Sequence, residues 1–147
     1  MGSEIIQKKS TDEKMTPQEK QKFSRRGLDV RLPAMDVFPN QFSNYKITLE
    51  VPEYTSMCPK TGQPDFAHVT LVYVPNKWCV ELKSFKLYIH AYRNLGIFYE
   101  NAVNRILKDF VSVAKPKWAY IKGDFTPRGG IRSVIESEYG RKPTKIS

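Results

Sequence analysis

The sequence predicts an α+β fold in which four antiparallel strands and two helices follow one another in the order ββααββ. Three observations predict it. Two strand-like runs lie within residues 44–74, two helix-like runs within residues 81–114, and two further strand-like runs within residues 118–139. Because neighbouring strands joined by short turns pair as hairpins, we expect one four-stranded antiparallel sheet with both helices on one face.

The first two strands are predicted from different patterns. In residues 44–51 apolar and polar side chains alternate, which is the period of a strand with one face in water. The apolar members are Tyr45, Ile47, Leu49 and Val51. The second run, residues 68–74, is apolar at nearly every position and ends at the turn residues Pro75 and Asn76. We expect the two runs to pair as a hairpin.

The two helices are predicted from apolar residues that lie three and four positions apart. Residues 81–94 carry the first set and residues 99–114 the second, with Leu95 and Gly96 between them and Pro116 after the second. The apolar sets are Leu82, Phe85, Ile89 and Tyr92, and then Val103, Ile106, Leu107, Phe110 and Val113. Each helix therefore has one apolar face to lay against the sheet.

The last two strands, residues 118–125 and 131–139, are joined by a Pro-Arg-Gly-Gly turn. In the second of them Ile131, Ile135 and Tyr139 share a side with two serines, and we interpret that side as part of the sheet face turned away from the helices. Such a sheet leaves one face and two edges uncovered. We therefore expect a homo-oligomer, because joining edges across copies pairs the free backbone and covers apolar surface.

Size and composition are those of one globular domain. The chain has 147 residues, of which 40% are hydrophobic, so it can bury a core. We expect residues 32–147 to be this domain, and residues 1–31, which have few large apolar side chains, to be a mobile basic leader. No apolar run reaches the roughly 18 residues that cross a bilayer. The start also lacks a secretory signal, so we expect a cytoplasmic protein without a membrane contact.

The net charge of +9 is concentrated at the two ends of the chain. Residues 1–31 hold eight Lys and Arg against five Asp and Glu, residues 32–114 eight against seven, and residues 115–147 eight against three. A basic surface favours an anionic partner, and a nucleic acid, a phosphorylated cofactor and an anionic lipid all remain open. The two cysteines and two histidines show no metal-ligand spacing, so we expect no metal site.

Residues 58–65, CPKTGQPD, are a candidate for nucleophilic chemistry. The lone thiol of Cys58 and the carboxylate of Asp65 stand at the two ends of a loop that Gly62 and two prolines favour as a tight turn. A nearby positive charge or hydrogen-bond donor would favour the reactive thiolate, and the carboxylate could deliver a proton. The alternatives are a small buried cysteine and an aspartate that caps a turn.

Charged residues at the starts of the two helices form a second candidate group. Lys83 and Lys86 lie three apart and share a helix face, where either an anion or ordinary solvation explains two neighbouring ammonium groups. Glu100 follows two aromatic residues at the start of the second helix. A carboxylate there either favours the helix dipole or accepts two hydrogen bonds from a flat heterocycle, and the residues alone favour the dipole.

Three separated motifs resemble those of the NADPH-dependent 7-cyano-7-deazaguanine (preQ0) reductases, the nitrile reductases of queuosine biosynthesis. They are CPKTGQPD at 58–65, VELKSFKLY at 80–88 and FTPRGG at 125–130. The resemblance covers about residues 37–139 and is to the short, single-domain form. It implies the tunnelling fold (T-fold) shared with GTP cyclohydrolase I, in which subunits join their sheets into an oligomeric barrel, a decamer being one such assembly, with sites at the interfaces.

The same resemblance implies the reaction. Cys58 would add to the nitrile carbon of 7-cyano-7-deazaguanine to give a covalent thioimide, and Asp65 would be the general acid that protonates the nitrile nitrogen. Two NADPH would then supply four electrons and yield 7-aminomethyl-7-deazaguanine for tRNA modification. The residues implied to contact the substrate are Val80, Glu81, Leu82, Tyr99 and Glu100. Those implied to meet the cofactor phosphates are Lys83, Lys86 and Arg128, and no nucleic acid is required.

Tyr99 departs from the pattern of the family, because some members carry histidine there. A tyrosine can still stack and donate a hydrogen bond, but it cannot act as an imidazole acid near neutral pH. We therefore expect a role in orienting the substrate ring.

Other functions remain open from the sequence. Archaeal amidinotransferases that act on deazaguanine in tRNA resemble this chain in fold and thioimide but lack the motif at 80–88. A basic RNA-binding module would explain the charge of +9, and predicts salt-dependent RNA affinity that persists without Cys58. A zinc cyclohydrolase would need metal ligands that the chain does not show.

Overall fold

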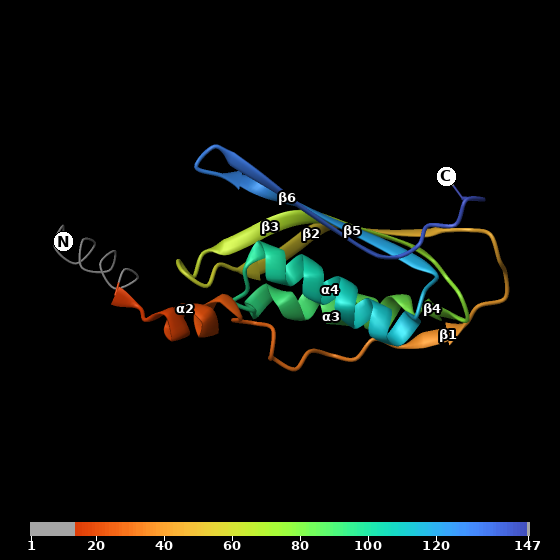
Figure 1. Cartoon of the computed structure of the whole chain (residues 1–147), viewed down its shortest axis with the longest axis horizontal. Helices are drawn as coiled ribbons and strands as arrows, with labels where there is room; N and C mark the ends of the chain where they lie inside the picture. The colour runs from red at the N-terminus through yellow and green to blue at the C-terminus, as the bar shows by residue number, and fades with distance from the viewer. Residues whose placement is uncertain (1–13, 147) are drawn as a thin grey trace.

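The computed structural model describes residues 14–146, so the first thirteen residues of the expected leader lie outside the described residues. The body is a four-stranded antiparallel sheet with two helices on one face (Figure 1). The bounds are β2 Ile47–Met57, β3 Pro64–Val74, α3 Leu82–His90, α4 Tyr99–Ala114, β5 Trp118–Arg128 and β6 Ile131–Gly140. The strands lie in the order β2-β3-β5-β6. The predicted α+β class and the order ββααββ are confirmed for these elements.

The first hairpin is longer than the sequence pattern indicated. β2 continues to Met57 and β3 begins at Pro64, whereas we expected the first strand to end at Val51 and the second to start at His68. A bulge in β2 between Val51 and Tyr54 accommodates the break in the alternation. Both strands therefore reach the turn that carries the CPKTGQPD motif.

The core lies between the sheet and the two helices. α4 has the predicted bounds and buries Ala102, Val103, Ile106, Leu107, Phe110 and Ala114. Gly123 of β5 lies beneath this helix, and a Cβ at that position would come within 2.6 Å of the Val103 side chain. Glycine thus allows the helix to approach the sheet closely. No described helix is long and apolar enough to span a membrane.

The first helix differs from prediction at its start. α3 buries Phe85, Tyr88 and Ile89, and a 3-10 turn, η2 (Ala91–Asn94), continues the chain from its end. Leu82, which we placed on the apolar face, is 63% exposed. It is the first residue of the helix and lies at the rim of the groove between α3 and β2.

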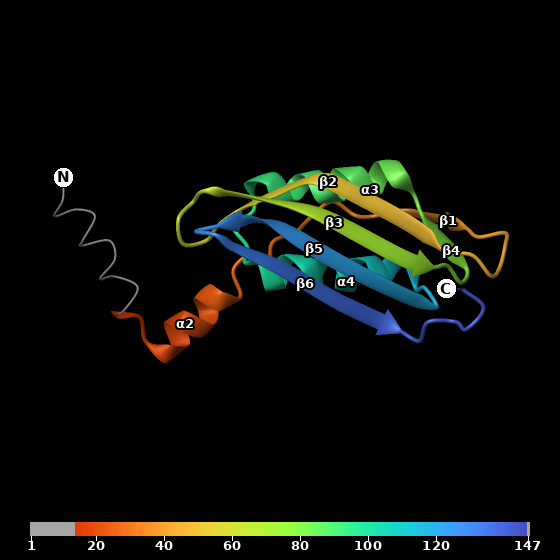
Figure 2. The same cartoon turned by 90° about the horizontal axis from the view of Figure 1, so that it is seen from above.

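The alternation in β6 was assigned to the wrong face. Ile135 is half-buried against the core, and its partner across β5 is Gly123, which lies beneath α4. Because side chains alternate along a strand, the row that contains Ile131, Ile135 and Tyr139 faces the helices. The open face, seen in Figure 2, is largely polar where β5 and β6 meet, with Arg132 paired to Asp124 at 2.5 Å.

A short two-stranded ribbon that we did not predict fixes the start of α3. β1 (Val37–Pro39) pairs antiparallel with β4 (Trp78–Val80). The Glu81 N–H donates to the Asp36 carbonyl at 2.8 Å, and the Asp36 N–H donates to the Ser84 hydroxyl at 2.8 Å. The segment before β1 is thereby tied to the first turn of the helix.

The described part of the expected leader is not irregular. Residues Pro17–Ser24 form a helix, α2, whose start is capped reciprocally by Thr16 and Glu19. The Phe23 ring meets the Phe98 ring edge-on at 5.6 Å, and Asn101 of α4 donates to the Ser24 carbonyl at 2.5 Å. The end of α2 thus contacts the chain at the start of α4.

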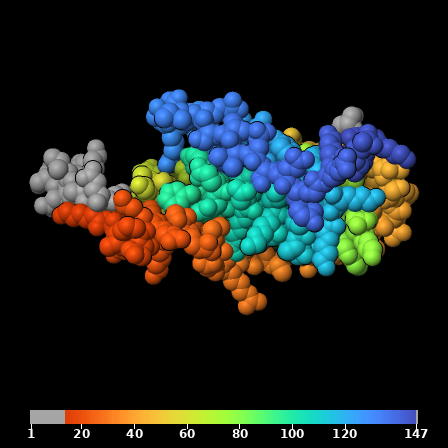
Figure 3. Space-filling view, viewed as in Figure 1, coloured from red at the N-terminus to blue at the C-terminus, as the bar shows by residue number. Residues whose placement is uncertain are grey.

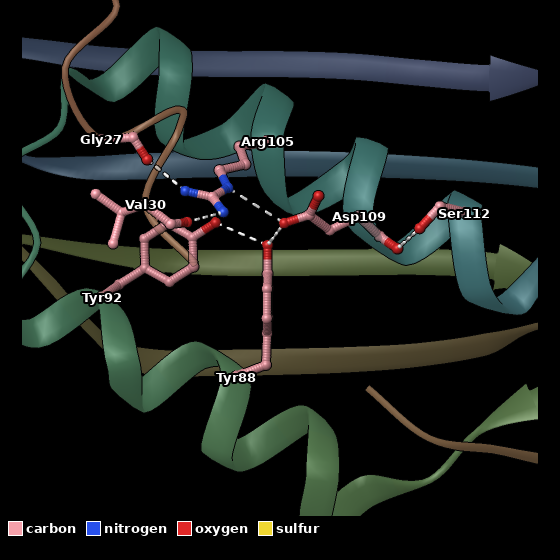
Figure 4. Close-up of polar contacts among 7 residues, drawn as sticks. All are labelled: Gly27, Val30, Tyr88, Tyr92, Arg105, Asp109 and Ser112. Carbon is pink, nitrogen blue, oxygen red and sulfur yellow. Dashed lines mark hydrogen bonds and ion pairs between the residues drawn. The ribbon is translucent and has the colours of Figure 1, made fainter. Parts of the chain in front are cut away.

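A buried polar cluster holds the chain that follows α2 (Figure 4). The Arg105 guanidinium donates to the carbonyls of Gly27 and Val30 and to the Asp109 carboxylate. The Tyr88 hydroxyl donates to the same carboxylate at 2.6 Å. In the space-filling view the orange chain after α2 lies against the green and teal body (Figure 3). We call residues 17–31 the strap.

Candidate active site

The turn between β2 and β3 is closed by its own backbone. The Cys58 N–H donates to the Gln63 carbonyl at 2.8 Å, and the Gly62 N–H donates to the Cys58 carbonyl at 2.9 Å. Gly62 has a φ of +68°, a conformation in which a side chain would be strained. The residue before the turn, Met57, exchanges hydrogen bonds with the chain at Leu95 and Ile97. The Cys58 backbone is therefore held from both sides.

The Cys58 thiol is partly exposed and its pKa is lowered. Burial acts to raise this pKa, but hydrogen bonds from the Thr61 hydroxyl and from the N–H groups of Thr61 and Lys60 outweigh it. The negative charge of Asp65 acts in the opposite direction and raises it. The turn thus stabilises a thiolate with donors alone.

We expected Asp65 at the end of the loop, but it is the second residue of β3. Its side chain is 3% exposed and turns toward the helix side of the sheet. Oδ1 accepts a hydrogen bond from the Tyr99 hydroxyl at 3.2 Å and lies 3.1 Å from Nη1 of Arg128. Burial raises the pKa of Asp65, and the Arg128 charge and the Tyr99 hydrogen bond oppose that rise without cancelling it.

The first turn of α4 brings two further predicted residues to this end of the sheet. Tyr99 stacks on the Phe125 ring with centroids 3.8 Å apart and planes at 12°. The next residue, Glu100, is exposed in the first turn, where its charge favours the helix dipole.

Two buried hydroxyls beside Asp65 were not foreseen. Tyr54 and Ser56 are each 1% exposed, and Ser56 lies directly across the β2–β3 ladder from Asp65. Neither hydroxyl has a hydrogen-bond partner within the described part of the chain. The interior around the carboxylate therefore contains two polar side chains that lie beyond the predicted end of the first strand at Val51.

The remaining predicted residues gather at the opposite end of the sheet. Val80 ends β4, and its N–H donates to the Tyr73 hydroxyl at 3.1 Å. Glu81 caps α3, because its carboxylate accepts from the N–H groups of Lys83 and Ser84, and these bonds lower its pKa. Glu81 therefore has a structural role that its assignment to the substrate did not include.

Lys86 lines a groove of about 680 Å³ between α3 and the edge strand β2. His90 of α3, Arg93 of η2 and Leu82 also line this groove, opposite Glu50 and Glu53 of β2. Lys83 is exposed but does not line the groove. The two lysines thus share the early part of α3, although only one of them faces β2.

One chain does not bring the two groups together. Asp65 and Tyr73 are eight residues apart on β3, which spans about 26 Å at about 3.3 Å per residue. Tyr73 contacts Val80, so the Cys58 group and the Val80 group lie at opposite ends of the sheet. Among residues 14–146 no three His, Cys, Asp or Glu side chains are grouped so that they could hold a metal ion.

Comparison with known proteins gives consistent matches. A family model described as QueF-like protein matches residues 64–144. The NADPH-dependent 7-cyano-7-deazaguanine reductase of Elusimicrobium minutum is 51% identical over 120 residues, which cover 81% of this chain and 91% of that enzyme. The enzyme of the same name from Chloroherpeton thalassium is 50% identical over 107 residues, covering 71% and 92%.

A solved structure shares the fold at lower identity. The archaeosine synthase QueF-Like, in its apo form, aligns with a TM-score of 0.63 and 20% identity, covering 71% of this chain and 100% of that one. At this identity the likeness shows the fold alone.

Proposed function

This chain belongs to the QueF-like family of NADPH-dependent 7-cyano-7-deazaguanine reductases, and we propose that it reduces the nitrile of 7-cyano-7-deazaguanine through a thioimide on Cys58. Reductase activity and the use of NADPH follow from relatives that are about half identical over most of their length. The observation that carries the covalent step is a partly exposed thiol with a lowered pKa, held beside a buried acid.

The thiolate attacks the nitrile carbon. A bond forms between Sγ of Cys58 and that carbon, and one π bond of the nitrile breaks to leave an electron pair on nitrogen. The Thr61 hydroxyl and the two backbone N–H groups raise the thiolate fraction near neutral pH, since they lower the pKa of the thiol. The rigid turn limits the orientations that the sulfur can adopt.

Asp65 supplies the proton that the nitrogen needs. Its burial raises the pKa and so increases the protonated fraction at a given pH. The product is a neutral thioimide, whose carbon is a better hydride acceptor than a nitrile carbon. The charge lost by sulfur passes to the Asp65 carboxylate, next to Arg128.

NADPH, when bound, supplies hydride. Reduction of a nitrile to an amine takes four electrons and therefore two NADPH molecules. The exposed ammonium groups of Lys83 and Lys86 fit its anionic phosphates, and Lys86 opens onto the groove beside β2. Arg128, which we also assigned to the phosphates, has its guanidinium committed to Asp65 and to the Pro64 carbonyl. We therefore propose the lysines as the main phosphate contacts.

The complete site requires a second copy of the chain. We propose that Val80, Glu81 and Leu82 contact the substrate together with Glu100 and Tyr99. In one chain, however, Val80 lies beside Tyr73, and β3 spans about 26 Å between Tyr73 and Asp65. A homo-oligomer that places the start of α3 of one copy against the Cys58 turn of another removes this separation. The exposed Leu82 would be covered there.

Incubation with the free nitrile base and NADPH tests the proposal. We expect NADPH oxidation, with two NADPH consumed per nitrile, and an intact-mass increase equal to the nitrile when NADPH is omitted. Cys58→Ala should lose both signals, and Asp65→Asn should slow adduct formation with a smaller loss of binding. An adduct that persists in Cys58→Ala would rule out this nucleophile.

The same assay separates the amidinotransferase alternative. That reaction would consume ammonia or an amine donor, leave NADPH unchanged and need deazaguanine already in tRNA. The relatives at about half identity are named reductases, whereas the archaeosine synthase is similar at 20% identity. Turnover of the free base with NADPH would therefore exclude the alternative.

A further inference from the structure

Two donors converge on one oxygen of Asp65 and leave the other free. Oδ1 accepts from the Tyr99 hydroxyl at 3.2 Å and lies 3.1 Å from Nη1 of Arg128. Oδ2 accepts no hydrogen bond from any residue in the described range. The two oxygens of one buried carboxylate are therefore chemically different before any ligand binds.

Both donors are fixed by contacts of their own. Tyr99 is the first residue of α4, and its ring stacks on the Phe125 ring. Arg128 lies beyond the last β5 residue that pairs with β3, and its Nη2 donates to the Pro64 carbonyl at 2.8 Å. The Arg128 guanidinium thus contacts both the Pro64 carbonyl and the carboxylate of the next residue, Asp65. Neither donor can follow Oδ1 freely if the carboxylate rotates.

This arrangement selects the oxygen that carries a proton. In a protonated carboxyl group the carbonyl oxygen can still accept two hydrogen bonds, while the hydroxyl oxygen becomes a donor. A proton on Oδ1 would compete with the Tyr99 hydroxyl and the Arg128 guanidinium, which are both donors. A proton on Oδ2 preserves both contacts in the ionised and in the protonated state.

We propose that Tyr99 and Arg128 are positioning residues that hold Oδ1 of Asp65 and so direct its acid proton to Oδ2. This rests on the proposed function, in which Asp65 protonates the nitrile nitrogen. In that step the Oδ2–H bond breaks and an N–H bond forms as the sulfur of Cys58 joins the carbon. The negative charge moves from sulfur to the carboxylate, where the guanidinium and the tyrosine hydroxyl stabilise it.

The pH dependence follows from the groups that face Asp65. They are Tyr54 from β2, Cys58 from the turn, Tyr99 from α4 and Arg128 from β5. Arg128 and then Tyr99 stabilise the ionised form, so removal of either raises the pKa of Asp65, and removal of Arg128 raises it more. The acid then stays protonated to higher pH, although it is held less firmly.

A measurement without turnover tests the positioning. Because the Asp65 charge raises the pKa of Cys58, titration of Asp65 gives an inflection in the pH profile of Cys58 alkylation by iodoacetamide, followed by peptide mass. Cys79 is only 4% exposed and is scored separately. We expect the inflection at higher pH in Tyr99→Phe than in the wild type, higher again in Arg128→Gln, and absent in Asp65→Asn. An inflection at the same pH in the wild type, Tyr99→Phe and Arg128→Gln would overturn the proposal.

Steady-state kinetics supply the second readout. Tyr99→Phe keeps the stacked ring and should lower kcat about fivefold with KM for the nitrile unchanged, since about 1 kcal/mol of hydrogen bonding is lost. The alkaline limb of its kcat profile should move to higher pH, and Tyr99→His, which restores a donor, should recover most of kcat. A Tyr99→Phe protein with wild-type kcat and limb would overturn the assignment.

Matched controls come from the open face of the sheet. There the Tyr120 hydroxyl donates to Glu136 and Arg132 pairs with Asp124, in the same chemical combinations. Tyr120→Phe and Arg132→Gln should leave the alkylation inflection unmoved, and a shift there would contradict a local effect. If the wild type does not turn over the nitrile, the proposed function fails, while the alkylation series still decides the positioning.

Discussion

At the scale of single residues, the Thr61 hydroxyl is one of the donors that lower the pKa of Cys58. The Thr61 Oγ1 accepts a hydrogen bond from the Gln63 N–H at 3.2 Å. The hydroxyl proton of Thr61 is therefore available for a hydrogen bond to the Cys58 sulfur. One hydroxyl thereby links the turn geometry to the charge on the nucleophile. The donor lies within the CPKTGQPD motif, three residues after the thiol.

We predict that Thr61→Val slows alkylation of Cys58 near neutral pH by roughly fivefold, the effect of about 1 kcal/mol of lost hydrogen bonding. The pKa of the thiol rises because a donor to the thiolate is removed, so the two rates should converge at alkaline pH, where both thiols are ionised. Thr48→Val, on the exposed side of β2, is the control. A constant ratio at all pH values would instead indicate altered access.

The buried Asp65 should lower the stability of the folded chain at neutral pH, because burial raises its pKa. Its pKa is raised in the folded state, so the unfolded chain gives up the proton at lower pH than the folded chain does. Stability contributed by the protonated form is therefore lost as pH rises from the unfolded pKa of about 4 through the folded pKa. We predict that Asp65→Asn abolishes most turnover yet raises Tm by about 2–4 °C at neutral pH. A Tm difference between Asp65→Asn and the wild type that is the same at neutral and acidic pH would contradict this.

The sequence singled out Cys58 and Asp65 as candidates but did not indicate their surroundings. Cys58 and Asp65 stand out because their residue types can attack and protonate, and the motif fixes their order. That Arg128 contacts Asp65 depends on where β5 stops pairing with β3, and no local pattern encodes this register. Tyr54 and Ser56 lie beyond Val51, the predicted end of the first strand, and were not singled out, since an unpartnered hydroxyl has no signature in sequence.

At the scale of elements, the strap connects the N-terminal segment to the helix that carries Tyr99. Its contacts fall on successive turns of α4, at Asn101 and Arg105, and on Phe98 just before the helix. The Arg105 guanidinium is also held by Asp109. The strap therefore restrains the first turn of α4, where Tyr99 meets Asp65.

We predict that Gly27→Ala loosens the strap. Gly27 has a φ of +87°, and a Cβ there would lie 2.7 Å from the Gly96 carbonyl oxygen and 2.8 Å from the Ile97 Cβ. Gly130→Ala is the matched control, because its φ is +76° but its Cβ would meet nothing within 4 Å. Both variants incur the left-handed strain of about 1–2 kcal/mol, and only Gly27→Ala adds overlap. Chymotryptic cleavage after Phe23 should accelerate in Gly27→Ala alone, and equal acceleration would contradict the overlap argument.

Element prediction succeeded where a long apolar period exists. α4 was predicted to the residue because five apolar side chains repeat along it, whereas α2 has no buried residue and was missed. A readable signal for α2 was present in Thr16, Pro17 and Glu19, which form a capping box with proline at the first turn. The three-residue strands of the β1–β4 ribbon are too short to show a period.

At the scale of the whole molecule, the residues proposed for the site lie at two opposite ends of the sheet. Cys58 and Asp65 lie at the β2–β3 turn. From Asp65, β3 runs about 26 Å to Tyr73, whose hydroxyl contacts Val80 just before α3. Leu82 is 63% exposed at that second location. Two copies arranged so that one end meets the other would cover this side chain and complete the set.

Mixed oligomers test this arrangement directly. Cys58→Ala lacks the nucleophile, and Leu82→Asp removes an exposed side chain from the other group, where an aspartate at the first helical position is tolerated by the dipole. Each variant alone should be inactive or nearly so. Because every site would take Cys58 from one copy and Leu82 from another, chains co-expressed in equal amounts with different tags should recover about one quarter of wild-type activity. No recovery in an oligomer shown to contain both tags would mean that one chain supplies both groups, and the shared site would be wrong.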